Sequence, residues 1–203
     1  ALEFLKKAKI KNKIFVDHTR PTTFKTRYMV NKQKVFRASR LKDHSIPMPI
    51  EKKIISEITE KSNDYQGILI SDFVYGLITP NLINAIHEFS HNIDIPVFAD
   101  VQSSSQYGNI LKFQNVELLC PNEREARIAL GNNDDSLENV AQQILKKSGS
   151  KKLILKLGSN GFISYDVKKN GHIEREHFPA LTINPLDETG AGDSLLSAIT
   201  ACL

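Results

Sequence analysis

The sequence predicts an α/β fold in which a mainly parallel central sheet lies between helices, giving three α/β/α layers. Two observations lead to this prediction. Short apolar runs of strand length, bounded by turn residues, recur along the chain. Amphipathic segments of helix length lie between several of them, and strand–helix–strand repeats make right-handed crossovers in a parallel sheet. Ligands bind such sheets beyond the carboxyl ends of the strands, so we expect a site there.

The first predicted element is a β-hairpin, because residues 24–30 and 34–39 alternate in polarity around Asn31-Lys32. Four compact apolar runs then predict buried strands, at residues 67–71, 96–99, 116–120 and 152–157. No internal repeat, low-complexity tract or linker divides the sequence, so residues 1–203 are expected to form a single domain.

Two helices are predicted from their capping residues. Residues 79–92 begin with Thr79, a good N-cap, followed by Pro80 in the first helical position. A second helix is expected to begin at Asp135, which forms a capping box with Glu138, and to end at Gly149.

Composition excludes several classes of protein. The chain is 40% hydrophobic and 25% charged, as in ordinary globular domains, and its net charge of +4 is spread along the sequence. Its densest basic stretch, residues 6–13, contains no aromatic residue, and no apolar run approaches the ~20 residues of a membrane span. The two cysteines have no metal-ligand spacing, and no signal-peptide pattern is present. We therefore expect a cytoplasmic protein with neither a nucleic-acid nor a membrane partner.

The strongest local motif is Asp-Glu-Thr-Gly-Ala-Gly-Asp at residues 187–193, which leads directly into a predicted helix. Glycines on both sides of Ala191 allow a tight turn whose N–H groups converge on one point, and the helix dipole adds positive potential there. Such a turn binds an anion, and Asp193 would lie beside it, where a base could accept a proton from an attacking hydroxyl. The alternative is a plain helix start with an acidic cap.

This motif resembles the second signature of the ribokinase (PfkB) family of carbohydrate kinases, commonly Asp-Thr-Thr-Gly-Ala-Gly-Asp; Glu188 departs from that form. The resemblance implies a ribokinase-like three-layer fold and ATP-dependent phosphorylation of a sugar hydroxyl with Mg²⁺. It also implies that Asp193 is the catalytic base and that Gly190, Ala191 and Gly192 form the anion hole.

Further motifs follow in the family's order. Asn122 and Glu125 match an Asn-x-x-Glu motif, which implies that Asn122 contacts nucleotide and metal and that Glu125 binds Mg²⁺ through water. A strand followed by a Gly-x-x-Gly turn resembles the segment that lines the ATP site, with the implied ligands Lys156, Gly158, Ser159 and Gly161. Ser71-Asp72 resembles a strand end of the family, where Asp72 could orient substrate or catalytic groups, and Asp100 resembles the Asp that ends the next strand. Each motif also has a purely structural alternative: a helix start for Asn-x-x-Glu, a hairpin turn for Gly-x-x-Gly and a loop cap for Asp72.

A more specific resemblance lies at residues 19–27, where Arg20, Lys25 and Arg27 match the Arg-Pro-Thr-Thr-x-Lys-x-Arg segment of heptose 7-phosphate kinases of this family. Lys25 and Arg27 alternate in phase on a strand, so both point to one face and could bind a substrate phosphate. The resemblance implies a heptose 7-phosphate or similar sugar phosphate as substrate. An exposed basic strand is the alternative.

The family domain is not fully covered, because its early sugar-binding strands and glycine-rich signature have no counterpart before Ala1. The resemblance therefore implies a fragment, the nucleotide-binding and catalytic part, which we expect to be inactive alone and which could assemble as a homodimer. Two other functions remain open. One is a catalytically silent sugar- or nucleotide-binding module, and the other is a zinc hydrolase using His87, Glu88 and His91, which fit His-Glu-x-x-His.

Overall fold

The computed structural model describes residues 2–30, 33–60, 65–102, 108–181 and 190–203. Its α-helices are α1 (Leu2–Lys7), α2 (Met48–Thr59), α3 (Pro80–Asn92), α4 (Glu123–Leu130), α5 (Leu137–Ser148) and α6 (Ala191–Cys202). Its strands are β1 (Phe24–Val30), β2 (Gln33–Arg40), β3 (Ile68–Asp72), β4 (Val97–Val101), β5 (Leu118–Leu119), β6 (Lys152–Lys156), β7 (Phe162–Val167) and β8 (Ile173–Phe178). Two short 3-10 helices, η2 (Ile110–Lys112) and η3 (Gly158–Asn160), complete the described elements.

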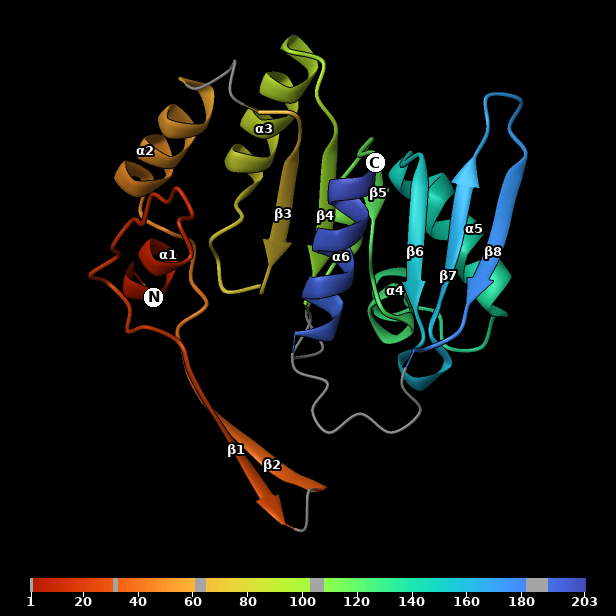
Figure 1. Cartoon of the computed structure of the whole chain (residues 1–203), viewed down its shortest axis with the longest axis horizontal. Helices are drawn as coiled ribbons and strands as arrows, with labels where there is room; N and C mark the ends of the chain where they lie inside the picture. Colours follow the sequence, from red (N-terminus) through yellow and green to blue (C-terminus); the bar gives the residue numbers. More distant parts are fainter. Residues whose placement is uncertain (1, 31–32, 61–64, 103–107, 182–189) are drawn as a thin grey trace.

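The main sheet has six strands in sequence order, from β3 to β8 (Figure 1). Strands β3 to β6 are parallel, as predicted, whereas β7 and β8 run antiparallel to their neighbours. The α/β fold is thus confirmed as a mixed, mostly parallel sheet. The predicted strand at 116–120 is shorter than expected, since only two of its residues pair as β5.

Helices cover both faces of this sheet, and the alternation of side chains along each strand decides which residues face which helices. One core contains Val97, Ala99 and Leu153 of the strands together with apolar residues of α3, α4 and α5. A smaller core on the opposite face joins Phe98 and Ile154 to α6, which lies in front of the sheet, roughly along its strands, in Figure 1. The two cores make the three layers that the sequence predicts.

Two of the three predicted helix caps are confirmed. The Thr79 hydroxyl accepts a hydrogen bond from the Leu82 N–H at 3.1 Å, and Gly149 ends α5 in the left-handed conformation with φ 67°. The N-cap of α5, however, is Ser136 and not Asp135. Oδ2 of Asp135 instead accepts hydrogen bonds from the side chains of Asn132 and Gln143, which orient this carboxylate toward those residues.

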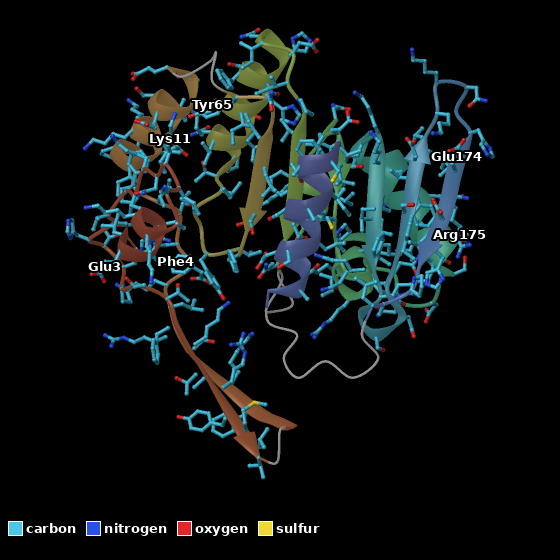
Figure 2. All side chains as sticks on the ribbon, viewed as in Figure 1. Glu3, Phe4, Lys11, Tyr65, Glu174 and Arg175 are labelled. Carbon is cyan, nitrogen blue, oxygen red and sulfur yellow. The ribbon has the colours of Figure 1, made fainter. Side chains whose placement is uncertain are left out.

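The predicted hairpin is confirmed as β1 and β2, an antiparallel pair outside the main sheet; its turn residues Asn31 and Lys32 lie outside the described part. It projects away from the domain, and its side chains extend into the surroundings (Figures 1 and 2). Tyr28 and Phe36 stack with their ring centroids 4.1 Å apart, and both are exposed. No helix in the described residues has the length and apolar character that crossing a membrane would require.

Candidate active site

Polar side chains gather at the carboxyl edge of the parallel strands. Asp72 is the last residue of β3, Asp100 lies near the end of β4, and Lys156 is the last residue of β6. Asn122 follows β5 closely and forms an isolated parallel bridge with Lys156. Parallel strands place all their carboxyl ends at one edge, so residues far apart in sequence meet there.

Asp193 lies in the first turn of α6, where that helix begins at this edge. Gly190 caps the helix with φ 84°, a left-handed conformation that favours glycine, and no side chain caps the helix at Gly190. The first-turn N–H groups of Ala191 and Gly192 have no intrahelical acceptors, as in any helix, and they suit an anion. The preceding motif residues Asp187, Glu188 and Thr189 lie outside the described residues.

Gln102 holds the Asp193 carboxylate and was missed by the sequence reasoning. Its side-chain amide donates a hydrogen bond to Asp193 Oδ1. Its backbone N–H donates to the Asp72 carbonyl at 2.7 Å, which fixes the start of the Gln102 side chain relative to β3. The only sequence signal for Gln102 was its place just beyond the predicted strand at 96–99.

Lys156 and Asp100 form an ion pair beside α6, with 2.8 Å between Nζ and Oδ2. Burial raises the pKa of the Asp100 carboxyl, while the Lys156 ammonium acts in the opposite direction. Burial alone would lower the pKa of Lys156, but nearby negative charge, that of Asp100 foremost and that of Glu125 also, outweighs burial and raises this pKa, so Lys156 remains charged. A Cβ atom on Gly192 would lie 3.4 Å from Lys156 Nζ, so the ammonium lies close to the predicted anion hole.

Asn122 and Glu125 cap the N-terminus of α4 reciprocally. The Asn122 side-chain oxygen accepts from the Glu125 N–H, and a Glu125 carboxylate oxygen accepts from the Asn122 N–H, each at 2.8 Å. Glu125 is buried. The predicted Asn-x-x-Glu pair is therefore also a capping box, which fixes both side chains near the site.

A hollow of about 800 Å³ lies between α4 and the turn after β6. The predicted nucleotide ligands Asn122, Lys156 and Gly158 line it, together with Arg124 and Arg127, which sequence reasoning did not assign. Ser159 lies in the same turn and is exposed.

Gly161 has a structural reason to be glycine. Its φ is +83°, and a Cβ there would lie 2.0 Å from the Phe178 carbonyl oxygen. The turn after β6 therefore packs directly against the end of β8.

A second cavity, of about 530 Å³, lies at the base of the hairpin and is lined by Arg20, Lys25 and Asp72. The Lys25 ammonium lies over the rings of Phe73 and Tyr75, with 5.4 and 5.0 Å to their centroids. This arrangement is a cation–π contact on the side of the cavity.

The other predicted substrate residues differ in their surroundings. The Arg20 guanidinium pairs with Asp17 at 2.7 Å and donates to the carbonyls of Tyr75 and His44, so it joins three segments at the base of the hairpin. Arg27 is exposed farther along β1, opposite Arg37.

Asp72 is also held by neighbouring groups. Its carboxylate pairs with Lys112 of η2 and accepts a hydrogen bond from the Val74 N–H at 2.9 Å. The ion pair with Lys112 was not foreseen.

The His-Glu-x-x-His residues lie on α3. His87 is partly buried and its Nε2 atom has no hydrogen-bond partner within the described residues, whereas Glu88 and His91 are exposed. Within the same residues, no group of three or more His, Cys, Asp or Glu side chains is placed to bind a metal ion.

The chain is similar to known proteins along nearly all of its length. A model of the pfkB family carbohydrate kinases matches residues 2–203. The bifunctional protein HldE of Campylobacter jejuni subsp. doylei is 30% identical over 203 residues, covering 96% of this chain but 40% of that protein.

Solved structures show a similar fold. The ribokinase of Giardia lamblia superimposes with a TM-score of 0.74 at 15% identity, over 98% of this chain and 61% of that one. The Arabidopsis thaliana ribokinase complexed with ribose and ATP superimposes with a TM-score of 0.61 at 17% identity, over 90% and 56% of the two chains.

Proposed function

The chain belongs to the pfkB family of carbohydrate kinases, and we propose that it forms the nucleotide-binding and catalytic part of an enzyme that transfers the γ-phosphoryl group of ATP to a sugar hydroxyl. The observation that carries this proposal is the position of Asp193. A carboxylate in the first turn of α6, next to the left-handed Gly190, lies beside an anion-binding helix start at the carboxyl edge of the sheet.

The proposed chemistry assigns separate roles to the two parts of this turn. The N–H groups of Gly190, Ala191 and Gly192 stabilise negative charge on the phosphoryl group during transfer. Asp193 accepts the proton of the attacking sugar hydroxyl, which then forms the new bond to phosphorus as the bond to the ADP leaving oxygen breaks. The Gln102 amide keeps the carboxylate in one orientation.

We propose that the nucleotide phosphates lie between this turn and the hollow lined by Asn122, Lys156 and Gly158, with Ser159 and Gly161 shaping the turn. Mg²⁺ would neutralise charge on the phosphates. Glu125 fits a role through water, since one of its oxygens already caps α4, and Mg²⁺ in such sites keeps several waters beside one or two carboxylates.

The proposed acceptor is a heptose 7-phosphate or a similar sugar phosphate. The resemblance at residues 19–27 and the similarity to HldE across 96% of the chain support this choice. Lys25 is the candidate phosphate ligand, because its ammonium lines the cavity that Asp72 also borders. Arg20 contributes by holding the base of the hairpin through its contacts with Asp17 and Tyr75, and Arg27 extends the basic face toward the hairpin tip.

A homodimer is the proposed assembly. The hairpin exposes apolar side chains that a second copy of the chain would cover, and isolated two-stranded hairpins are at best marginally stable in water. These exposed residues are Phe24, Tyr28, Met29, Val30, Val35 and Phe36.

The chain spans about 40% of the length of the curated relatives that it matches, so the test uses the whole protein encoded by the reading frame that contains it. We propose that residues 1–203 alone do not catalyse transfer. The assay incubates the whole protein with ATP, Mg²⁺ and either heptose 7-phosphate, ribose or fructose 6-phosphate. ADP is measured and the product is identified by mass.

Saturable ADP formation with a sugar product of increased phosphate content supports the kinase. Binding of ATP or sugar without turnover would favour a catalytically silent module on the same fold. Stoichiometric zinc in the purified protein, lost together with a hydrolytic activity on mutation of His87, would favour a hydrolase.

A further inference from the structure

The ion pair between Asp100 and Lys156 spans the end of β5, because β5 lies between the strands that carry these two residues. Both side chains lie on the face of the sheet that α6 covers. Phe98 and Ile154, each two positions earlier on the same strand, pack with Leu196 of α6, and residues two apart on a strand share a face.

Stability does not explain this pair. Asp100 is 0% exposed, and its Oδ1 atom has no hydrogen-bond partner within the described residues. Burial raises the pKa of this carboxyl, which means that its charged form is held against a desolvation penalty. Buried ion pairs contribute little net stability and are often replaceable by apolar side chains of similar volume.

The Lys156 ammonium has the reach and the free donors to act on a ligand. Of its three N–H donors, one is directed at Asp100, and the described residues offer no second acceptor within hydrogen-bond distance. Its side chain is 15% exposed and borders the hollow beside α4. The ammonium is also close to Gly192, where a Cβ would lie 3.4 Å from Nζ.

Two other groups lie near this ammonium. The buried carboxylate of Glu125 adds to the negative charge that raises the pKa of Lys156, but the hydrogen bonds between Glu125 and Asn122 serve the cap of α4. Cys120 lies on the same face at the end of β5, and burial raises the pKa of its thiol to about 12, so the sulfur is neutral at pH 7. A lysine side chain has a flexible four-carbon stem, and a fixed acceptor is needed to select one of its rotamers.

We propose that Asp100 is a positioning residue of the phosphoryl-transfer site, holding the Lys156 ammonium against the Gly190–Gly192 turn so that it contacts the transferred phosphate. This inference rests on the proposed function. A cation fixed in advance stabilises developing charge without reorganising at the moment of reaction, which a solvent-exposed lysine would not achieve.

The test is a double-mutant cycle in the whole protein, with Asp100→Asn, Lys156→Met and the double variant. ATP affinity is measured by calorimetry, KM for ATP and kcat by steady-state assay, and the folded state by circular dichroism and thermal midpoint. Lys152→Met is the matched control. Lys152 is the first residue of β6, at the end of the strand opposite to Lys156, and its ammonium pairs with Glu117 at 2.5 Å.

We expect Asp100→Asn to lower kcat/KM for ATP by about 10- to 100-fold, the scale of a misplaced catalytic group. In the Lys156→Met background, the same substitution should have no further effect, because Asp100 acts through the ammonium. The double variant should be at least as thermally stable as Lys156→Met, and Lys152→Met should keep wild-type ATP affinity.

Wild-type kinetics in Asp100→Asn, or an undiminished effect in the Lys156→Met background, would overturn the inference while leaving the proposed function intact. A wild-type protein without kinase activity would overturn both. If Asp100→Asn does not fold, Asp100→Glu retains the charge but displaces the ammonium by one methylene. Unchanged ATP affinity in Asp100→Glu would then overturn the inference, and weakened affinity would support it.

Discussion

The side-chain amide of Gln102 donates a hydrogen bond to the carboxylate of Asp193, although 91 positions separate the two residues in the chain. The contact joins the residue that follows β4 to the first turn of α6. The hydrogen bond is made at one carboxylate oxygen, Oδ1, and under the proposed function the other oxygen, Oδ2, would accept the proton of the attacking hydroxyl. The proposed base and the residue that orients it therefore come from different elements that meet only in the folded chain.

Asp193→Asn removes the proposed base but keeps the shape of the side chain. We expect kcat to fall by about 10²- to 10⁴-fold, the usual contribution of a positioned base, while ATP still binds. Steady-state assay and calorimetric titration with ATP measure the two effects. Asp166→Asn on β7 is the matched control, since Asp166 pairs with Lys168 at 2.7 Å away from the site. Near-wild-type turnover in Asp193→Asn would show that Asp193 is not the catalytic base.

Gln102→Ala removes the only described side-chain donor to Asp193 Oδ1. We expect kcat to fall about 10-fold or more with little change in KM for ATP, because a misoriented base affects the reaction more than binding. Gln102→Asn, with a shorter side chain that cannot reach the carboxylate, should behave like Gln102→Ala. A change confined to KM would instead indicate that Gln102 contacts substrate.

The sequence predicted a site at the carboxyl edge of the sheet because parallel strands share this edge, and the structure places Asp72, Asp100 and Asn122 there. The sequence did not predict the partners of these residues. The Lys112 partner of Asp72 is 40 positions away, and such pairs follow no local periodicity. The site was thus predictable in location and motif but not in its supporting contacts.

Similar reasons explain the differences in the fold. Strand β8 was missed because its residues are mostly exposed and polar, so no buried alternation marks it. The cap of α5 was assigned to Asp135 because aspartate is a good N-cap. In the structure the Gln143 side chain donates a hydrogen bond to the Asp135 carboxylate, and Ser136 caps the helix. Both outcomes depend on tertiary neighbours that local patterns do not contain.

Lys25→Ala should raise KM for a phosphorylated sugar at least about 10-fold more than KM for its unphosphorylated counterpart, since a charge-assisted contact to phosphate is lost. The prediction follows from the place of this ammonium in the cavity near Asp72. Both values of KM are measured with each substrate. Arg40→Ala, an exposed change on β2, is the control for loss of charge from the hairpin. Equal changes for both substrates would indicate an exposed basic strand without a phosphate site.

Gly161→Ala should destabilise the protein more than Gly171→Ala. Both glycines have nearly the same positive φ, +83° and +81°, so both substitutions cost about 1–2 kcal/mol of backbone strain. Only at Gly161 would the new Cβ lie 2.0 Å from a backbone oxygen, that of Phe178, whereas at Gly171 it meets nothing within 4 Å. Urea unfolding of the two variants gives the difference directly. Equal losses would contradict the close packing of the turn against β8.

Acidification should lower the free energy of unfolding through Glu117. The two carboxylate oxygens of this residue pair with Lys151 and Lys152 at 2.8 and 2.5 Å. Burial alone would raise the pKa of Glu117, but the hydrogen bonds and the charges of the two lysines together outweigh burial and hold this pKa below its ordinary value of 4.5. The folded state therefore binds a proton less readily than the unfolded chain, so this stabilisation is fully present above pH 4.5. This stabilisation is lost as the pH falls from 4.5 through the lowered pKa of Glu117.

The free energy of unfolding of the wild type should exceed that of Glu117→Gln at pH 7, and the difference should shrink steadily in urea titrations below pH 4.5. A difference that stays constant down to pH 3 would mean that the carboxylate form of Glu117 is not what the two lysines stabilise.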